Sequence, residues 1–184
     1  MPQTIPSLYD ALKHNPMFAG LDHYEFGVVE HYLTFRALDA GETLFYEGER
    51  GDYMAVVVAG NLDVFKKVRP PVNLQKSHHN LEGEPVDIVK SDDKANPNQQ
   101  DNLVHIVSLK AGASKGEMSV IDEMSRSATV VASERTGLII LPKADFDRIL
   151  QDHPRIGIDI LKGIAQILSI HLRRTSADLS KERL

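Results

Sequence analysis

Short runs of β-branched and aromatic residues, separated by glycines, constrain the fold of this chain more than any other feature. Glycines fall at positions 41, 48, 51 and 60, and none of the runs between them is long enough for a typical helix. Strands this short, divided by turns, are typical of an antiparallel sandwich or barrel. The runs are TLFY (43–46), YMAVVVA (53–59), LDVF (62–65), VHIVSL (104–109), ATVVAS (128–133) and GLIIL (137–141).

Helical signals lie on both sides of the strands. Ser7 with Asp10, and Asp22 with Glu25, have the spacing of helix N-terminal caps. Beyond the strands, a short amphipathic helix is predicted to stop near Pro154, because proline disfavours helix at the residue before it. The helix after Asp22 is predicted to carry Phe26, Val29 and Leu33 on one face, and the one before Pro154 to carry Phe146, Ile149 and Leu150.

A long final helix is predicted over residues 155–179. Apolar residues recur there at steps of three and four, a pattern suited to a coiled-coil seam. We therefore expect a homodimer through this helix; the alternative is that the helix packs on its own barrel. The seam consists of Leu161, Ile164, Leu168, Leu172, Thr175 and Leu179.

Residues 67–102 differ from the rest of the chain. They contain four prolines and the polar run SDDKANPNQQDN, with little periodicity beyond VDIV at 86–89. This composition predicts a long, flexible polar insertion between two strands.

Composition excludes several classes of protein. The chain has no cysteine, which excludes disulfides, thiolate metal sites and cysteine nucleophiles. Its net charge of −5 argues against a generally basic nucleic-acid surface, so no direct DNA binding is expected. The longest apolar run, Ala55 to Gly60, is far shorter than the roughly 20 residues of a membrane span, and the N-terminus shows no signal peptide. A cytoplasmic protein without membrane contact is expected.

The segment KGEMSVIDEMSRSATVVA (115–132) carries the chemistry. Gly116 lets the backbone approach a ligand closely. The turn at 118–121 offers free N–H groups, and Arg126 can present two parallel donors to phosphate oxygens. Glu117 can accept hydrogen bonds from sugar hydroxyls. Together these groups predict a site for a small phosphorylated sugar that needs no metal.

This segment resembles the phosphate-binding cassette of cyclic nucleotide-binding domains, in which Phe-Gly-Glu precedes a small apolar helix and Pro-Arg-x-Ala-Thr. Lys115 and Ser125 stand where the family usually has Phe and often has Pro. The likeness continues in NPMFAGLDHYEF (15–26), in residues 40–65 and in LPKADFDRIL (141–150). The matching cassette residues are Gly116, Glu117, Met118, Ser119, Val120, Ile121, Arg126, Ser127, Ala128 and Thr129.

The resemblance implies a mainly β fold, a double-stranded β-helix or jelly-roll-like barrel with N-terminal helices and a long C-terminal helix. It divides the chain into a helical segment (1–34), a barrel core (35–142, with the insertion 67–102) and C-terminal helices (143–184).

The resemblance also implies a non-catalytic sensor of cAMP or cGMP with no cofactor and no metal. Glu117 would bind the ribose 2′-hydroxyl and Arg126 the phosphate, while the amides near Ser119 and Val120 would complete the cradle. Movement of the C-terminal helices would pass the signal to a protein effector that the sequence does not identify. All cassette residues from Gly116 to Val120 and from Arg126 to Thr129 are expected to bind ligand, and Thr175 and Ser176 are candidate base contacts.

Two other classes of function remain open at the level of sequence. The first is a protein-interaction module that keeps the fold without the ligand. The second is a cupin-type enzyme, which would need clustered His and Glu metal ligands. The intact pair of Glu117 and Arg126 argues against the interaction module, and His105, which stands alone among the predicted strands, argues against the enzyme. The sensor is therefore preferred.

Overall fold

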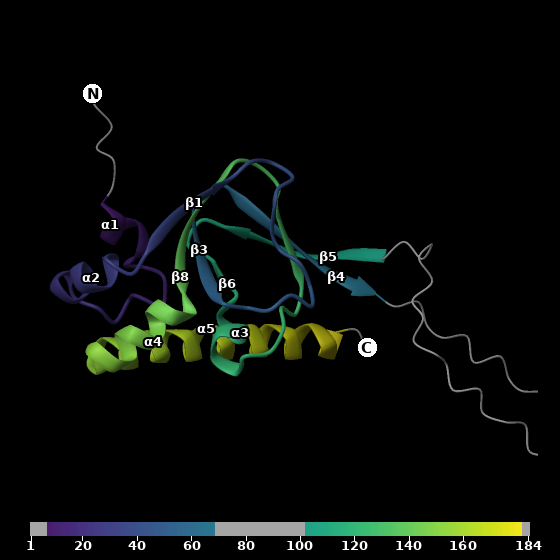
Figure 1. Cartoon of the computed structure of the whole chain (residues 1–184). Helices are drawn as coiled ribbons and strands as arrows, with labels where there is room; N and C mark the ends of the chain where they lie inside the picture. Colours follow the sequence, from purple (N-terminus) through teal and green to yellow (C-terminus); the bar gives the residue numbers. More distant parts are fainter. Residues whose placement is uncertain (1–6, 69–101, 182–184) are drawn as a thin grey trace, which may run out of the picture.

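Two four-stranded antiparallel sheets face each other and form the body of the molecule (Figure 1). The structure, a computed structural model, describes residues 7–68 and 102–181. One sheet has the strand order β1-β8-β3-β6 and the other β2-β7-β4-β5, which confirms the predicted jelly-roll architecture. The strands are β1 (Thr34–Leu38), β2 (Thr43–Phe45), β3 (Tyr53–Ala59), β4 (Asn61–Val68), β5 (Asn102–Lys110), β6 (Ser114–Lys115), β7 (Thr129–Ala132) and β8 (Thr136–Pro142).

Two of these strands were not predicted. β1 buries only Leu38, so its sequence TFRAL shows no alternation of buried and exposed positions. β6 has two residues and pairs with β3 at Val56 and Ala55. Both depend on partners that are distant in sequence, and the local pattern therefore gives no signal for them.

The helices follow the predicted caps. They are α1 (Leu8–Leu12), α2 (His23–Glu30), α3 (Glu117–Asp122), α4 (Lys143–Asp152) and α5 (Pro154–Lys181). The Ser7 hydroxyl accepts from the Asp10 amide, and Asp22 forms a capping box with Glu25. The apolar face predicted for the helix after Asp22 extends too far, because α2 ends at Glu30. Leu33 packs against the core from the turn that follows the helix.

The hydrophobic core has two parts. One lies between the sheets and includes Phe45, Leu62 and Leu138. The other joins the outer face of β3 and β8 to the N-terminal helices, α4 and α5, and includes Phe26 and Ile160. In Figure 1, α5 runs along one side of the barrel, and α3 lies on the same side. The second core thus fixes α5 beside the segment that carries the cassette.

The first half of α5 packs on its own barrel, which is the alternative that the sequence left open. Its most buried residues are Ile156, Ile160, Ile164 and Ile167. Ile164 therefore belongs to the intramolecular face, and Leu172, in the predicted seam, is 69% exposed. The side chain of Leu179, also in the predicted seam, lies outside the part of the chain that the structure describes. The proposed insertion 67–102 lies almost wholly outside the described residues, and the barrel boundary predicted at 35 falls one residue inside β1.

Candidate functional site: a buried arginine and glutamate beside α3

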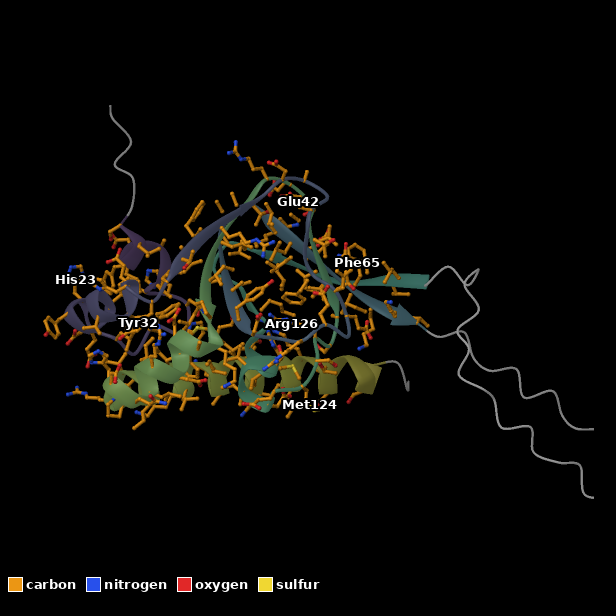
Figure 2. All side chains as sticks on the ribbon, in the orientation of Figure 1. His23, Tyr32, Glu42, Phe65, Met124 and Arg126 are labelled. Atoms are coloured by element: carbon orange, nitrogen blue, oxygen red, sulfur yellow. The ribbon has the colours of Figure 1, made fainter. Side chains whose placement is uncertain are left out.

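Arg126 lies at the end of the barrel that faces α3 and α5 (Figure 2), and 3% of it is exposed. Its Nη1 donates to the Ser119 Oγ at 2.8 Å and to the Gly116 carbonyl at 3.2 Å, and its Nη2 donates to the Tyr53 carbonyl at 2.8 Å. Its Nε is buried without a hydrogen-bond partner.

Aromatic rings and desolvation define the electrostatics of Arg126. The guanidinium carbon lies 4.2 Å from the centroid of the Phe45 ring and 4.6 Å from that of Tyr53. Such stacking favours a cation in a poorly hydrated site. Burial lowers the pKa of Arg126, while Tyr53 and the nearby carboxylates oppose that shift. The guanidinium stays charged, as arginine does in proteins, and its buried Nε–H has no acceptor in the protein.

Glu117 is the first residue of α3 and is 1% exposed. Its Oε1 lies 3.6 Å from the His171 Nδ1 on α5, and its Oε2 is buried with no hydrogen-bond partner. Glu117 is thus paired with His171 and not with Arg126, which removes the simplest structural explanation of the two residues, a salt bridge at the barrel end. A buried carboxylate oxygen without a donor is costly and calls for a partner.

Two glycines make this close packing possible. Gly116 has φ +90°, in the left-handed region, and a Cβ there would come within 2.5 Å of the Arg126 Nη1. Gly51 lies across from α3, and a Cβ at that position would overlap the Ser119 side chain. The backbone of 51 and 116 therefore approaches the arginine more closely than any other residue type permits.

Arg126 and Glu117 line a pocket of about 240 Å³. It gathers seven of the predicted cassette positions with Phe45 from β2. Lys115 and Ser125, the two departures from the family pattern, also line it. The predicted residues among its lining are Gly116, Glu117, Met118, Ser119, Arg126, Ser127 and Ala128.

Four predicted residues lie elsewhere. Val120 is buried in the core beside α5, and Thr129 is buried with its hydroxyl accepting from the Glu47 amide. Thr175 and Ser176 are exposed on α5, and the Thr175 hydroxyl donates to the His171 carbonyl. Their role as base contacts remains a prediction.

Sequence reasoning missed His171 and Phe45. A signal for His171 exists, because it continues the buried line Ile160, Ile164 and Ile167 at steps of three and four. A polar residue at the end of an apolar stripe indicates a contact with the same surface. Phe45 carries no such signal, because its stacking on Arg126 depends on strands far apart in sequence.

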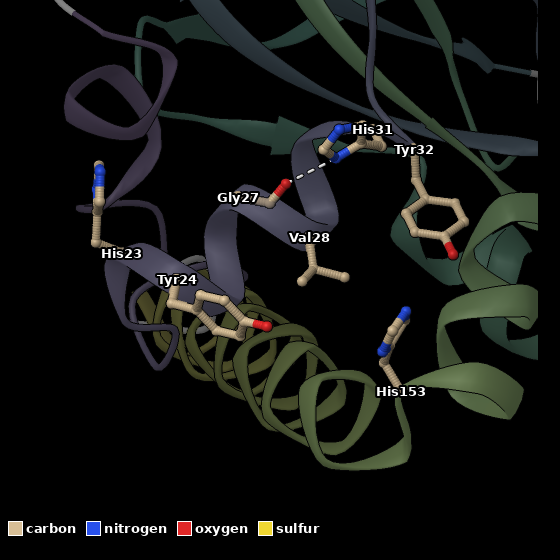
Figure 3. A pocket seen from close by; sticks show the side chains of 7 residues that line it. All are labelled: His23, Tyr24, Gly27, Val28, His31, Tyr32 and His153. Atoms are coloured by element: carbon tan, nitrogen blue, oxygen red, sulfur yellow. Dashed lines mark hydrogen bonds between the residues drawn. The ribbon is translucent and has the colours of Figure 1, made fainter.

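A second hollow lies on the N-terminal side of the molecule (Figure 3), between α2 and the junction of α4 with α5. It has a volume of about 600 Å³ and is lined by His23, Tyr24, Gly27, Val28, His31, Tyr32 and His153. Among the described residues, no group of three potential ligands is arranged to hold a metal ion.

The fold and the site together define a class: a jelly roll with a buried arginine and a buried carboxylate at one end. A sequence model of the cyclic nucleotide-binding domain matches residues 89–153. A cyclic nucleotide-binding domain from Methylobacillus flagellatus, known from a crystal structure, superimposes with a TM-score of 0.68 at 25% identity, covering 89% of this chain and 75% of that one. In sequence over residues 89–153, and in fold, this chain matches the cyclic nucleotide-binding domain family.

Curated relatives agree. The cAMP-dependent protein kinase regulatory subunit of Blastocladiella emersonii is 30% identical over 143 residues, which are 78% of this chain and 28% of that protein. The cyclic AMP receptor protein of Thermus thermophilus is 26% identical over 168 residues, 91% of this chain and 62% of that protein.

The lysophospholipase NTE1 of Candida glabrata is 27% identical over 138 residues, but the match covers 7% of that enzyme. The matches to the kinase regulatory subunit, the receptor protein and the lysophospholipase therefore each cover less than two thirds of that protein's length. Within the described ranges, no helix is both long and apolar enough to cross a membrane.

Proposed function

We propose that this chain is a non-catalytic sensor that binds cAMP or cGMP in the pocket beside α3. One observation carries the proposal: two polar atoms, the Glu117 Oε2 and the Arg126 Nε, are both buried in that region without a partner. A cyclic nucleotide supplies what each atom lacks, a hydroxyl donor for the carboxylate and an anionic oxygen for the guanidinium.

The roles follow the family resemblance. Arg126 holds the phosphate oxygens, the amides near Ser119 and Val120 complete the cradle, and Glu117 accepts from the ribose 2′-hydroxyl. The pocket of about 240 Å³ is smaller than the roughly 300–1,000 Å³ of typical small-molecule sites. It suits the sugar and phosphate, and the base would extend beyond it to a surface that includes α5.

We propose that α5 also joins two copies of the chain. Ile158, Ala165 and Leu172 are exposed and lie seven residues apart, with the half-buried Leu161 and Leu168 between them. This is the heptad spacing of a two-stranded coiled coil. The seam uses Leu161, Leu168 and Leu172 of the predicted set, whereas Ile164 faces the barrel. A ligand that shifts α5 would change this interface or the surface offered to a protein effector.

Isothermal titration calorimetry with cAMP and with cGMP tests the site. The wild-type chain should bind about one nucleotide per chain. Hydrogen bonds to a charged partner contribute about 1.5–3 kcal/mol, so Arg126→Ala should weaken binding by about 10- to 150-fold. Arg148→Ala is the matched control, because Arg148 lies exposed on α4 with Asp145 as its partner. It should leave the affinity unchanged.

Arg126 also supports the fold through Ser119, Gly116 and Tyr53, so a second variant guards against unfolding. Arg126→Lys keeps the charge but loses the planar fork, and it should fall between wild type and Arg126→Ala. No heat and no thermal-shift response of the wild-type chain to either nucleotide would refute the proposal and favour a ligand-free interaction module.

A further inference from the structure

The two oxygens of the Glu117 carboxylate have different surroundings. Oε1 lies 3.6 Å from the His171 Nδ1, whereas Oε2 is buried and has no hydrogen-bond partner. The two carboxylate oxygens are thus distinct: Oε1 faces α5, and Oε2 remains for a ligand. The side chain of Glu117 is 2% exposed, so this contact is shielded from solvent on the carboxylate side.

His171 is held in place by the packing of α5. It lies one turn beyond the buried Ile167, and its side chain is 39% exposed. The charged groups that act on the imidazole are Glu117 and Lys115 from the cassette and Arg174 from its own helix. His171 therefore connects the end of the buried face of α5 to the cassette.

The distance of 3.6 Å is longer than a hydrogen bond, for which about 2.7–3.2 Å is usual. A movement of α5 toward α3 by about half an ångström would convert the contact into one. A bound hydroxyl that donates to Oε2 fixes the plane of the carboxylate, which then presents Oε1 to the imidazole. Ligand binding in the pocket and a closer approach of α5 to α3 are thus linked through the side chain of Glu117.

We propose that His171 is a positioning residue for ligand recognition: its N–H holds the Glu117 Oε1, which leaves Oε2 for the ribose 2′-hydroxyl and ties α5 to the occupied pocket. This inference rests on the proposed function. It also differs from the expectation for Thr175 and Ser176, because His171 acts through Glu117 and not on the base.

A nucleotide that lacks the hydroxyl separates this role from a merely structural one. Affinities for cAMP and for 2′-deoxy-cAMP are measured by calorimetry for the wild type, His171→Leu and His171→Gln. His171→Leu should weaken cAMP binding by about tenfold but change 2′-deoxy-cAMP binding by less than about twofold, because the second ligand makes no bond to Glu117. His171→Gln keeps an N–H donor and should bind cAMP within about threefold of wild type.

His105→Leu is the matched control. His105 also faces a carboxylate, at 3.4 Å from the Asp63 Oδ1, but on the exposed surface of β5. It should bind both nucleotides as the wild type does.

Equal losses for both nucleotides in His171→Leu, or no loss, would overturn the positioning role while leaving the sensor intact. A wild-type chain that binds neither nucleotide would instead overturn the proposed function, and this inference with it.

Discussion

Gly51 is the position where one added methyl group should damage the pocket most directly. It is buried between β2 and β3, and a Cβ there would overlap the Ser119 side chain and come within 3.2 Å of the Arg126 guanidinium carbon. The Ser119 hydroxyl accepts from Arg126 at 2.8 Å. Gly51→Ala must therefore push α3 outward or move the loop that carries position 51.

The magnitude follows from the cost of adding volume to a packed site, about 1–3 kcal/mol. For a chain of this size, about 1 kcal/mol corresponds to a change of about 2–4 °C in Tm. Gly51→Ala should thus lower Tm by about 2–12 °C and weaken cyclic nucleotide binding, because the Arg126–Ser119 hydrogen bond is lost or distorted.

Gly27→Ala is the matched control, since it adds the same methyl group in the interior of α2, where a Cβ would meet nothing within 4 Å. Alanine is favoured over glycine in a helix by about 0.5–1 kcal/mol, so Tm should rise by about 1–4 °C and binding should not change. Differential scanning calorimetry measures both variants. Equal Tm values for Gly51→Ala and wild type would refute the close-approach argument.

Two further predictions concern α5. Leu172→Glu, in the exposed seam, should convert a dimer to a monomer, as measured by light scattering. Ile170→Glu, away from the seam, is the control and should leave the dimer intact. A wild-type chain that is a monomer both with and without nucleotide would contradict the coiled-coil proposal. Burial lowers the pKa of His171 from 6.5, with Glu117 opposing the shift. Below about pH 6.5, His171 therefore takes up a proton more readily in the unfolded chain than in the folded one. The free energy of unfolding is not reduced by this group above about pH 6.5, and it falls as the pH drops below that value. In urea unfolding, wild type should lose stability relative to His171→Gln between about pH 7 and 5.5; parallel curves would refute this.

Local sequence predicted the elements whose signals are local. The Asp22–Glu25 capping box and the stop before Pro154 each depend on a few neighbouring residues, and both appear in the structure. β1 could not be found in this way, because four of its five residues are exposed and its pairing with β8 joins segments about 100 residues apart. Long-range pairing leaves little trace in a local pattern.

The cassette was predicted from residue types and spacing, and the structure brings Gly116, Glu117 and Arg126 to one pocket. Sequence did not predict that Arg126 would lie over the rings of Phe45 and Tyr53, nor that Glu117 would face His171. These contacts join β2, β3, α3 and α5, so they exist only after the two cores have formed.

Local conformational preference and residue type were enough to predict the class of fold, the helix caps and the order of the chemical groups in the cassette. Which of those groups lose contact with water, and which atoms remain without a partner, depends on packing between elements that are distant in sequence. Burial of Glu117 and Arg126 arises from the packing of α3 against β3 and beside His171 of α5. This burial leaves the Glu117 Oε2 and the Arg126 Nε without a partner, and the proposed binding site depends on these two atoms.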